Sequence, residues 1–179
     1  MKKSFYLTFL ILLLFSCTNT KPDSESSLRK QAKDIAVKYI ADKFDEPKEI
    51  IEKDGKITIT ENHTNFILKE SKHITYTIDP SKIYTGLIDD DDEKDAIISI
   101  TSFTGNFIEM PEHLILINTD GKLMLNRAIE SYMKIMGIKE RIITAEIPTR
   151  SPNSPLRDCS VCKEIVKYQF KTGDLIRME

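Results

Sequence analysis

Tryptophan is absent from this 179-residue chain, and cysteine, histidine, glycine and proline are scarce, at three, three, six and seven residues. So little glycine and proline, without any internal repeat, excludes a collagen-like, low-complexity or solenoid protein. The formal net charge is −2, and acidic and basic residues are interspersed. The chain therefore lacks the basic surface that a DNA- or RNA-binding protein needs, and we expect no nucleic-acid partner.

Catalytic and metal-binding signatures are also missing. The chain has no nucleophile elbow, zinc-protease helix, phosphate loop or dinucleotide fingerprint. Its three histidines, His63, His73 and His113, are isolated in the sequence, and its single C-x-x-C pair has no second pair to complete a four-ligand zinc site. We therefore predict a protein that is not an enzyme. The alternative is a catalytic cluster that only folding assembles.

The N-terminus is the most specific part of the sequence. It reads MKKSFYLTFLILLLFSC, in which two lysines precede an apolar segment, 5–15, and a serine precedes Cys17. The apolar segment has the length of a signal-peptide core and is shorter than the about 20 residues of a membrane-spanning helix. The end of this stretch, LLFSC at 13–17, resembles the lipobox of bacterial lipoproteins.

The lipobox resemblance implies three segments. Residues 1–16 would be a lipoprotein signal peptide, 17–26 the lipidated Cys17 with a flexible tether, and 27–179 a single α+β globular domain. Two or three acyl chains on the cysteine anchor a protein stably, because each buried CH₂ contributes about 0.8 kcal/mol. Since Thr18 rather than aspartate follows the cysteine, the resemblance implies an outer-membrane anchor, with the domain in the periplasm or on the cell surface.

The rest of the chain predicts one helix followed by many strands. With 40% hydrophobic residues, the chain can build a substantial core. A helix is expected from Ser24 or Ser26 to about Phe44, because apolar residues recur at three- and four-residue spacing until Pro47 stops it. The apolar face of this helix consists of Leu28, Ala32, Ile35, Ala36, Tyr39 and Ile40.

Short β-branched runs separated by polar turns predict the strands. They are expected at 56–61, 64–70, 73–79, 95–103, 113–118, 122–125, 141–147, 163–170 and 174–178. Helical spacing of Ile129, Tyr132, Met133 and Met136 predicts one further helix near 127–137. Because βαβ alternation is missing, we predict an α+β fold, with an N-terminal amphipathic helix packed on a mainly antiparallel β-sheet.

The C-x-x-C pair, Cys159 and Cys162, lies between a proline-punctuated loop and a terminal strand. A thioredoxin-type redox pair lies instead at a helix N-terminus that follows a buried strand. In an exported protein, two nearby cysteines form a disulfide by default. We therefore predict a local disulfide between them, which contributes modest stability because the loop that it closes is short.

Four consecutive aspartates occur in GLIDDDDEKDAIISI, residues 86–100. This segment resembles the acidic calcium-binding segment of FG-GAP or integrin-like repeats, which place carboxylates on alternate residues of a tight loop. The resemblance implies that Asp89, Asp91 and Asp95 are side-chain ligands and that Glu93 binds through its backbone or side chain. An apolar residue replaces the first aspartate of that pattern and aspartates replace both glycines. It therefore implies weak Ca²⁺ binding and no required cofactor; the alternative is a solvated turn that leads into a strand.

The lipobox and the missing catalytic signatures together predict a membrane-anchored envelope lipoprotein with a non-catalytic binding or structural role. Its partners would be the lipid bilayer, through acylated Cys17, and an unknown envelope or exported protein. The alternative is an immunity- or inhibitor-type lipoprotein that blocks an exported enzyme or toxin, which suits the small size and mild acidity of the chain.

Overall fold

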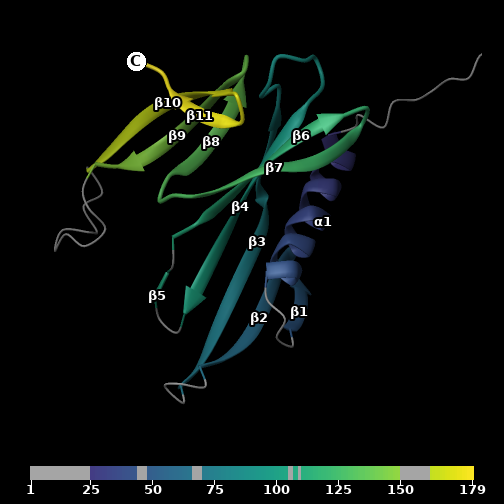
Figure 1. The fold of residues 1–179 in the computed structure, drawn as a ribbon, viewed down its shortest axis with the longest axis vertical. Helices are drawn as coiled ribbons and strands as arrows, with labels where there is room; N and C mark the ends of the chain where they lie inside the picture. The colour runs from purple at the N-terminus through teal and green to yellow at the C-terminus, as the bar shows by residue number, and fades with distance from the viewer. Residues whose placement is uncertain (1–24, 44–47, 66–69, 105–106, 109, 150–161) are drawn as a thin grey trace, which may run out of the picture.

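The structure, a computed structural model, describes residues 25–43, 48–65, 70–104, 107–108, 110–149 and 162–179 (Figure 1). The predicted signal peptide, Cys17 and Cys159 lie outside these residues. Within the described ranges the chain forms one helix and eleven strands, and every strand pair is antiparallel. The predicted α+β class, with one helix on a mainly antiparallel sheet, is therefore confirmed.

Helix α1 spans Glu25–Lys43, so it begins just before the predicted start of the domain. The helix is not apolar enough to cross a membrane. The strands are β1 (Lys48–Lys53), β2 (Lys56–Asn65), β3 (Glu70–Gly86), β4 (Asp95–Thr104), β5 (Phe107–Ile108), β6 (Glu112–Thr119), β7 (Lys122–Glu130), β8 (Lys134–Lys139), β9 (Ile142–Pro148), β10 (Lys163–Lys171) and β11 (Asp174–Arg177).

The strands form two sheets. The large sheet has seven strands in the order β1-β2-β3-β4-β6-β7, with β5 paired to β4, and the small sheet has the order β11-β10-β9-β8. Figure 1 shows α1 on one side of the long central strands and the small sheet on the other. The central strands β4 and β6 are therefore covered on both faces.

Strand β4 contributes to two separate cores, because successive side chains of a strand point to opposite faces. Ala96, Ile98 and Ile100 pack with α1, whereas Ile97 packs with the small sheet. None of the four is more than 1% exposed. The nearly uninterrupted apolar run AIISI is thus explained, since strands buried on both faces lose the usual polar alternation.

Helix α1 buries the face that its spacing predicts. The residues in contact with the large sheet are Leu28, Ala32, Ala36 and Ile40. On the exposed side, Arg29 pairs with Glu25 at 2.8 Å across one helical turn. The same arginine also donates to the carbonyl oxygen of Ile83 at 2.7 Å, so it fastens the helix to β3.

The predicted helix near 127–137 is wrong. β7 runs through the first part of this segment and β8 through the last part. Its apolar residues come from β7, from β8 and from the turn between them, and Ile129, Met133 and Ile135 all pack into the core beneath the small sheet. Two short strands joined by a turn can therefore imitate the three- and four-residue spacing of a helix.

Two strand predictions also differ from the structure. The expected strands do not include β1, because four of the six residues in KEIIEK are charged. The expected strand at 64–70 is not a separate element, since its described ends belong to β2 and β3. In both places the pairing along β2 determines the strand, and local composition does not reveal it.

Candidate functional site

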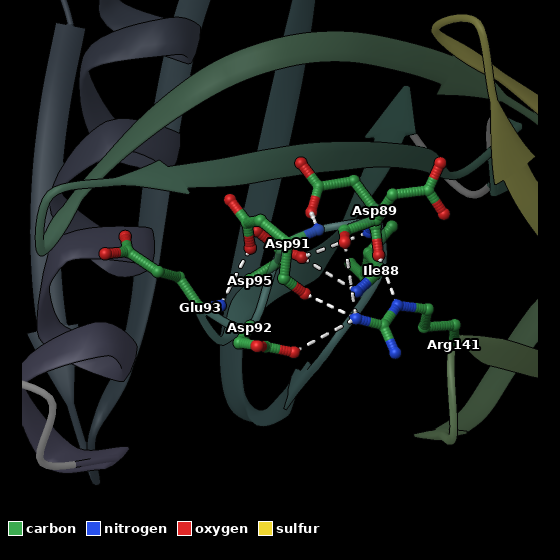
Figure 2. A network of polar contacts seen from close by, with 8 residues as sticks. Ile88, Asp89, Asp91, Asp92, Glu93, Asp95 and Arg141 are labelled. Atoms are coloured by element: carbon green, nitrogen blue, oxygen red, sulfur yellow. Dashed lines mark hydrogen bonds and ion pairs between the residues drawn. The ribbon is translucent and has the colours of Figure 1, made fainter.

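The acidic segment forms the loop between β3 and β4, and Figure 2 shows its side chains. Asp95, the first residue of β4, is fully buried. Its Oδ2 atom accepts from the N–H groups of Ile88 at 2.7 Å and Asp89 at 3.4 Å, and its Oδ1 atom accepts from that of Asn118 at 2.9 Å. This carboxylate therefore joins the loop to β6. Burial raises the pKa of Asp95 to about 6, although the backbone hydrogen bonds oppose that shift.

The other three predicted ligands also accept hydrogen bonds from backbone N–H groups. Asp89 Oδ1 accepts from Asp91 N at 3.1 Å, and Asp91 Oδ1 accepts from Glu93 N at 2.7 Å. Glu93 Oε2 accepts from Gly121 N in the β6–β7 turn at 3.4 Å. The two aspartates thus form successive Asx turns, in which a side chain holds the backbone two residues further on.

Arg141, which the sequence patterns did not indicate, supplies the positive charge of this loop. From the β8–β9 turn, its Nε atom donates to Asp89 O at 2.7 Å and its Nη2 atom to Asp91 O at 2.7 Å (Figure 2). The Nη2 atom also lies 3.3 Å from Asp92 Oδ1. Arg141 itself has a φ of 61°, a left-handed conformation that is uncommon for a residue with a side chain. The guanidinium therefore binds the carbonyl oxygens on the inside of the loop.

This geometry bears on the calcium prediction. The fold does bring Asp89, Asp91, Glu93 and Asp95 to one loop, as the resemblance implies. Among the residues that the structure describes, no group of three or more His, Cys, Asp or Glu side chains is arranged to hold a metal ion. Backbone N–H groups bind one carboxylate oxygen each of Asp89, Asp91 and Glu93 and both oxygens of Asp95, while Arg141 binds two carbonyl oxygens of the loop. Calcium binding at this loop stays a prediction.

The predicted disulfide lies only in part within the described chain. Cys162 immediately precedes β10, whereas Cys159 lies outside the described residues, as does Cys17. The carbonyl oxygen of Cys162 accepts a hydrogen bond from Thr149 N at 2.9 Å, next to the end of β9. This bond closes the base of the segment that contains Cys159. The disulfide itself stays a prediction.

A second polar feature, between the sheets, joins β4 to β6. His113 is 2% exposed, with its Nδ1 atom 2.9 Å from Ser99 Oγ and its Nε2 atom 3.1 Å from Ser131 O. A carbonyl oxygen can only accept, so Nε2 carries the proton and Nδ1 accepts from the Ser99 hydroxyl. Burial lowers the pKa of His113, which keeps the ring neutral near pH 7. The other histidines, His63 and His73, lie in β2 and β3.

Sequence reasoning missed the Ser99–His113 pair. The two residues are cross-strand partners of β4 and β6, separated by 14 positions in the chain. Neither residue lies in a recognisable sequence motif. They are neighbours only because the register of β4 against β6 places them opposite each other. The sequence shows only a serine within an apolar run and a histidine near the start of the next long strand. These two features do not predict that the side chains touch unless the register between the two strands is known.

Comparisons of this chain with protein-family models, with curated proteins and with solved structures found no match.

Proposed function

We propose that this protein is a bacterial envelope lipoprotein, anchored to the membrane through acylated Cys17, whose domain has a non-catalytic binding or structural role. One observation supports the anchor above all: two lysines, an apolar segment, a small residue and a cysteine follow one another at the N-terminus. The partner of the domain would be another envelope or exported protein.

The position of α1 limits where such a partner can be. Residues 18–24 separate Cys17 from the start of the helix at Glu25. Even a fully extended chain of that length spans only about 25 Å, at roughly 3.5 Å for each residue. The domain would thus stay close to the membrane surface. A partner would have to be membrane-bound itself or come to that surface.

The non-catalytic role is supported by the surroundings of Ser99. A hydroxyl that donates to a neutral imidazole has the arrangement of a nucleophile and its base. Ser99, however, lies inside strand β4, with its backbone in the register of β6. Serine nucleophiles of the elbow type lie on a sharp turn, where free backbone N–H groups stabilise the oxyanion. Ser99 lies on no such turn.

The anchor is tested by the variant Cys17→Ser with Ser16→Ala as its matched control. The control keeps a small residue before the cysteine, so it should be processed and found with the membranes. Cys17→Ser should lose incorporation of a palmitate analogue and retain its signal peptide. If Cys17→Ser keeps the mature mass of the wild type and stays in the membrane fraction, the lipoprotein proposal is wrong.

The role of the domain is tested by crosslinking in intact cells. Lipidated wild-type protein should capture a membrane-bound or exported protein, and the unlipidated variant should capture less of it. If the captured protein is an exported enzyme that loses its activity in the complex, the inhibitor-type alternative replaces the general binding role. Turnover of a substrate by the purified chain itself would contradict a non-catalytic domain.

A further inference from the structure

A groove opens between the two sheets, beside the Ser99–His113 pair. It has a volume of about 390 Å³ and is lined by residues of β3, β4, β6, the β7–β8 turn and β8. Small-molecule sites typically have volumes of roughly 300 to 1,000 Å³. The groove thus has room for a ligand of the size of a single ring with its substituents.

One wall of the groove is a bulge in β3. Between two regular cross-strand pairs, residues 79–82 of β3 stand opposite Ser99 alone. Ser81 donates from its N and Oγ atoms to Asp79 Oδ1, at 3.0 and 2.6 Å. Arg29 of α1 donates to a backbone carbonyl oxygen of β3 at 2.7 Å. The bulge is therefore held in place, and bulges of this kind are over-represented next to functional sites.

The floor of the groove is polar where the adjoining core is apolar. Ile97 and Ile115 form one cross-strand pair of β4 and β6 and are fully buried beneath the small sheet. The next pair along the same face is Ser99 and His113, both of which line the groove. Since the Ser99 hydroxyl donates to His113, its lone pairs stay available to accept from a donor group of a ligand.

The rim of the groove is positively charged. Lys82 and Lys134 both line it, together with Tyr84 and Tyr132, whereas no carboxylate does. Two carboxylates close to these lysines pair with other lysines: Asp79 with Lys56 at 3.6 Å, and Glu146, the cross-strand partner of Lys134, with Lys163 at 2.8 Å. Longer-range attraction still links Lys82 to Asp79 and Lys134 to Glu146, although neither lysine forms a direct ion pair within the described part of the chain. Two exposed ammonium groups beside aromatic rings complement a ligand that carries a negative charge and a flat apolar body.

We propose that this groove binds a small organic anion, with its carboxylate or phosphate group at Lys82 and Lys134. The body of the ligand lies against Tyr84, Tyr132 and Met133, and a donor group of the ligand reaches the Ser99 hydroxyl. The proposal does not depend on lipidation of Cys17, so either one can fail without the other.

The test is saturation-transfer NMR on the full-length protein in detergent, with three named probes. 4-Hydroxybenzoate carries a carboxylate, phenyl phosphate carries a phosphate, and 4-hydroxybenzamide is the neutral match of the first. We expect at least one of the anions to bind about tenfold more tightly than the amide. The comparison of carboxylate with phosphate shows which anionic group the site prefers.

Three variants place the binding in the groove. Lys82→Ala and Lys134→Ala should each weaken binding of the anion about two- to fivefold, and together they should abolish its advantage over the amide. Lys122→Ala, which removes an exposed lysine at the start of β7 outside the groove, should change nothing. Circular dichroism verifies that the exposed substitutions leave the fold intact.

Equal binding of the amide and both anions would overturn the proposal. So would an anion preference that persists in the double variant or that falls equally in Lys122→Ala. Failure of both anions to bind at millimolar concentration would overturn it as well, because a site with two lysines and a matching apolar wall should hold such a probe at that level.

Discussion

The acidic loop and the groove between the sheets use their polar groups differently. In the loop, the carboxylates of Asp89, Asp91, Glu93 and Asp95 all accept from backbone N–H groups, and Arg141 binds the carbonyl oxygens. In the groove, Lys82 and Lys134 line an open volume that no carboxylate lines, although Glu146 stands opposite Lys134 in the small sheet. The densest charge in the sequence is thus used to build the fold, while two scattered lysines stay available for a ligand.

Replacing Asp95 with alanine should have the largest effect on stability. The change leaves three N–H groups without their acceptor in or near the core, and we expect a loss of about 3 kcal/mol or more in the free energy of unfolding. Denaturant unfolding measures it. Asp91→Ala is the matched control in the same loop, with an expected loss of about 1 kcal/mol. Equal losses would show that Asp95 does not have a special structural role.

The contact between the two sheets should be the next most sensitive place. A Cβ atom on Gly86 would lie 2.7 Å from Ile138 Cγ2 and 2.9 Å from Ile138 Cβ, where β3 meets β8. Gly86→Ala should therefore cost about 2 kcal/mol, because the small sheet must shift. Gly137→Ala, whose Cβ would meet nothing within 4 Å, should leave the melting temperature nearly unchanged. A neutral Gly86→Ala would mean that the sheets are not in tight contact there.

Arg141→Ala should loosen the loop and bring out any calcium binding. The change removes hydrogen bonds to Asp89 O and Asp91 O, with an expected loss of about 1 to 2 kcal/mol. Because the guanidinium occupies carbonyl oxygens that suit Ca²⁺, calcium should raise the melting temperature of the variant more than that of the wild type. Thermal melts with calcium and with chelator test this. If calcium and chelator give the same melting temperature in both the wild type and the variant, the loop does not bind calcium.

A change of pH should act in opposite directions on the two regions. The folded state raises the pKa of Asp95 from 3.8 to about 6, so it binds the proton more tightly than the unfolded chain and Asp95 contributes less stability as pH rises from about 4 to 6. Burial lowers the pKa of His113 below 6.5. The stability that the neutral ring contributes is therefore lost as pH falls from 6.5 toward the pKa of the folded state.

Two variants separate these contributions in melts between pH 4 and pH 7.5. Asp95→Asn should remove the part of the stability that declines toward pH 6, and His113→Gln the part that declines on acidification. A pH profile that neither substitution changes would contradict both assignments.

Prediction from the sequence succeeded where local pattern and tertiary burial agree. The spacing of Leu28, Ala32, Ala36 and Ile40 predicted the buried face of α1, and the strands expected at 113–118 and 122–125 lie within β6 and β7. It failed at 127–137, where apolar residues of β7, of β8 and of the turn between them share a core and have the spacing of a helix. The local spacing of apolar residues cannot distinguish a helix from two strands joined by a turn, because the difference depends on which surface of the core each residue contacts.

The candidate sites divide in the same way. The sequence by itself determined that the four acidic residues share one loop, since they are close in the chain, and it determined the order of residues that predicts lipidation at Cys17. Only the tertiary structure decided that Arg141 enters that loop from a turn 50 residues beyond Asp91, and that Ser99 meets His113. Both contacts depend on the sheet register and on how the two sheets pack. Long-range pairing of this kind leaves no periodic signal in the sequence, because the partners are brought together by the closure of the fold and not by their spacing.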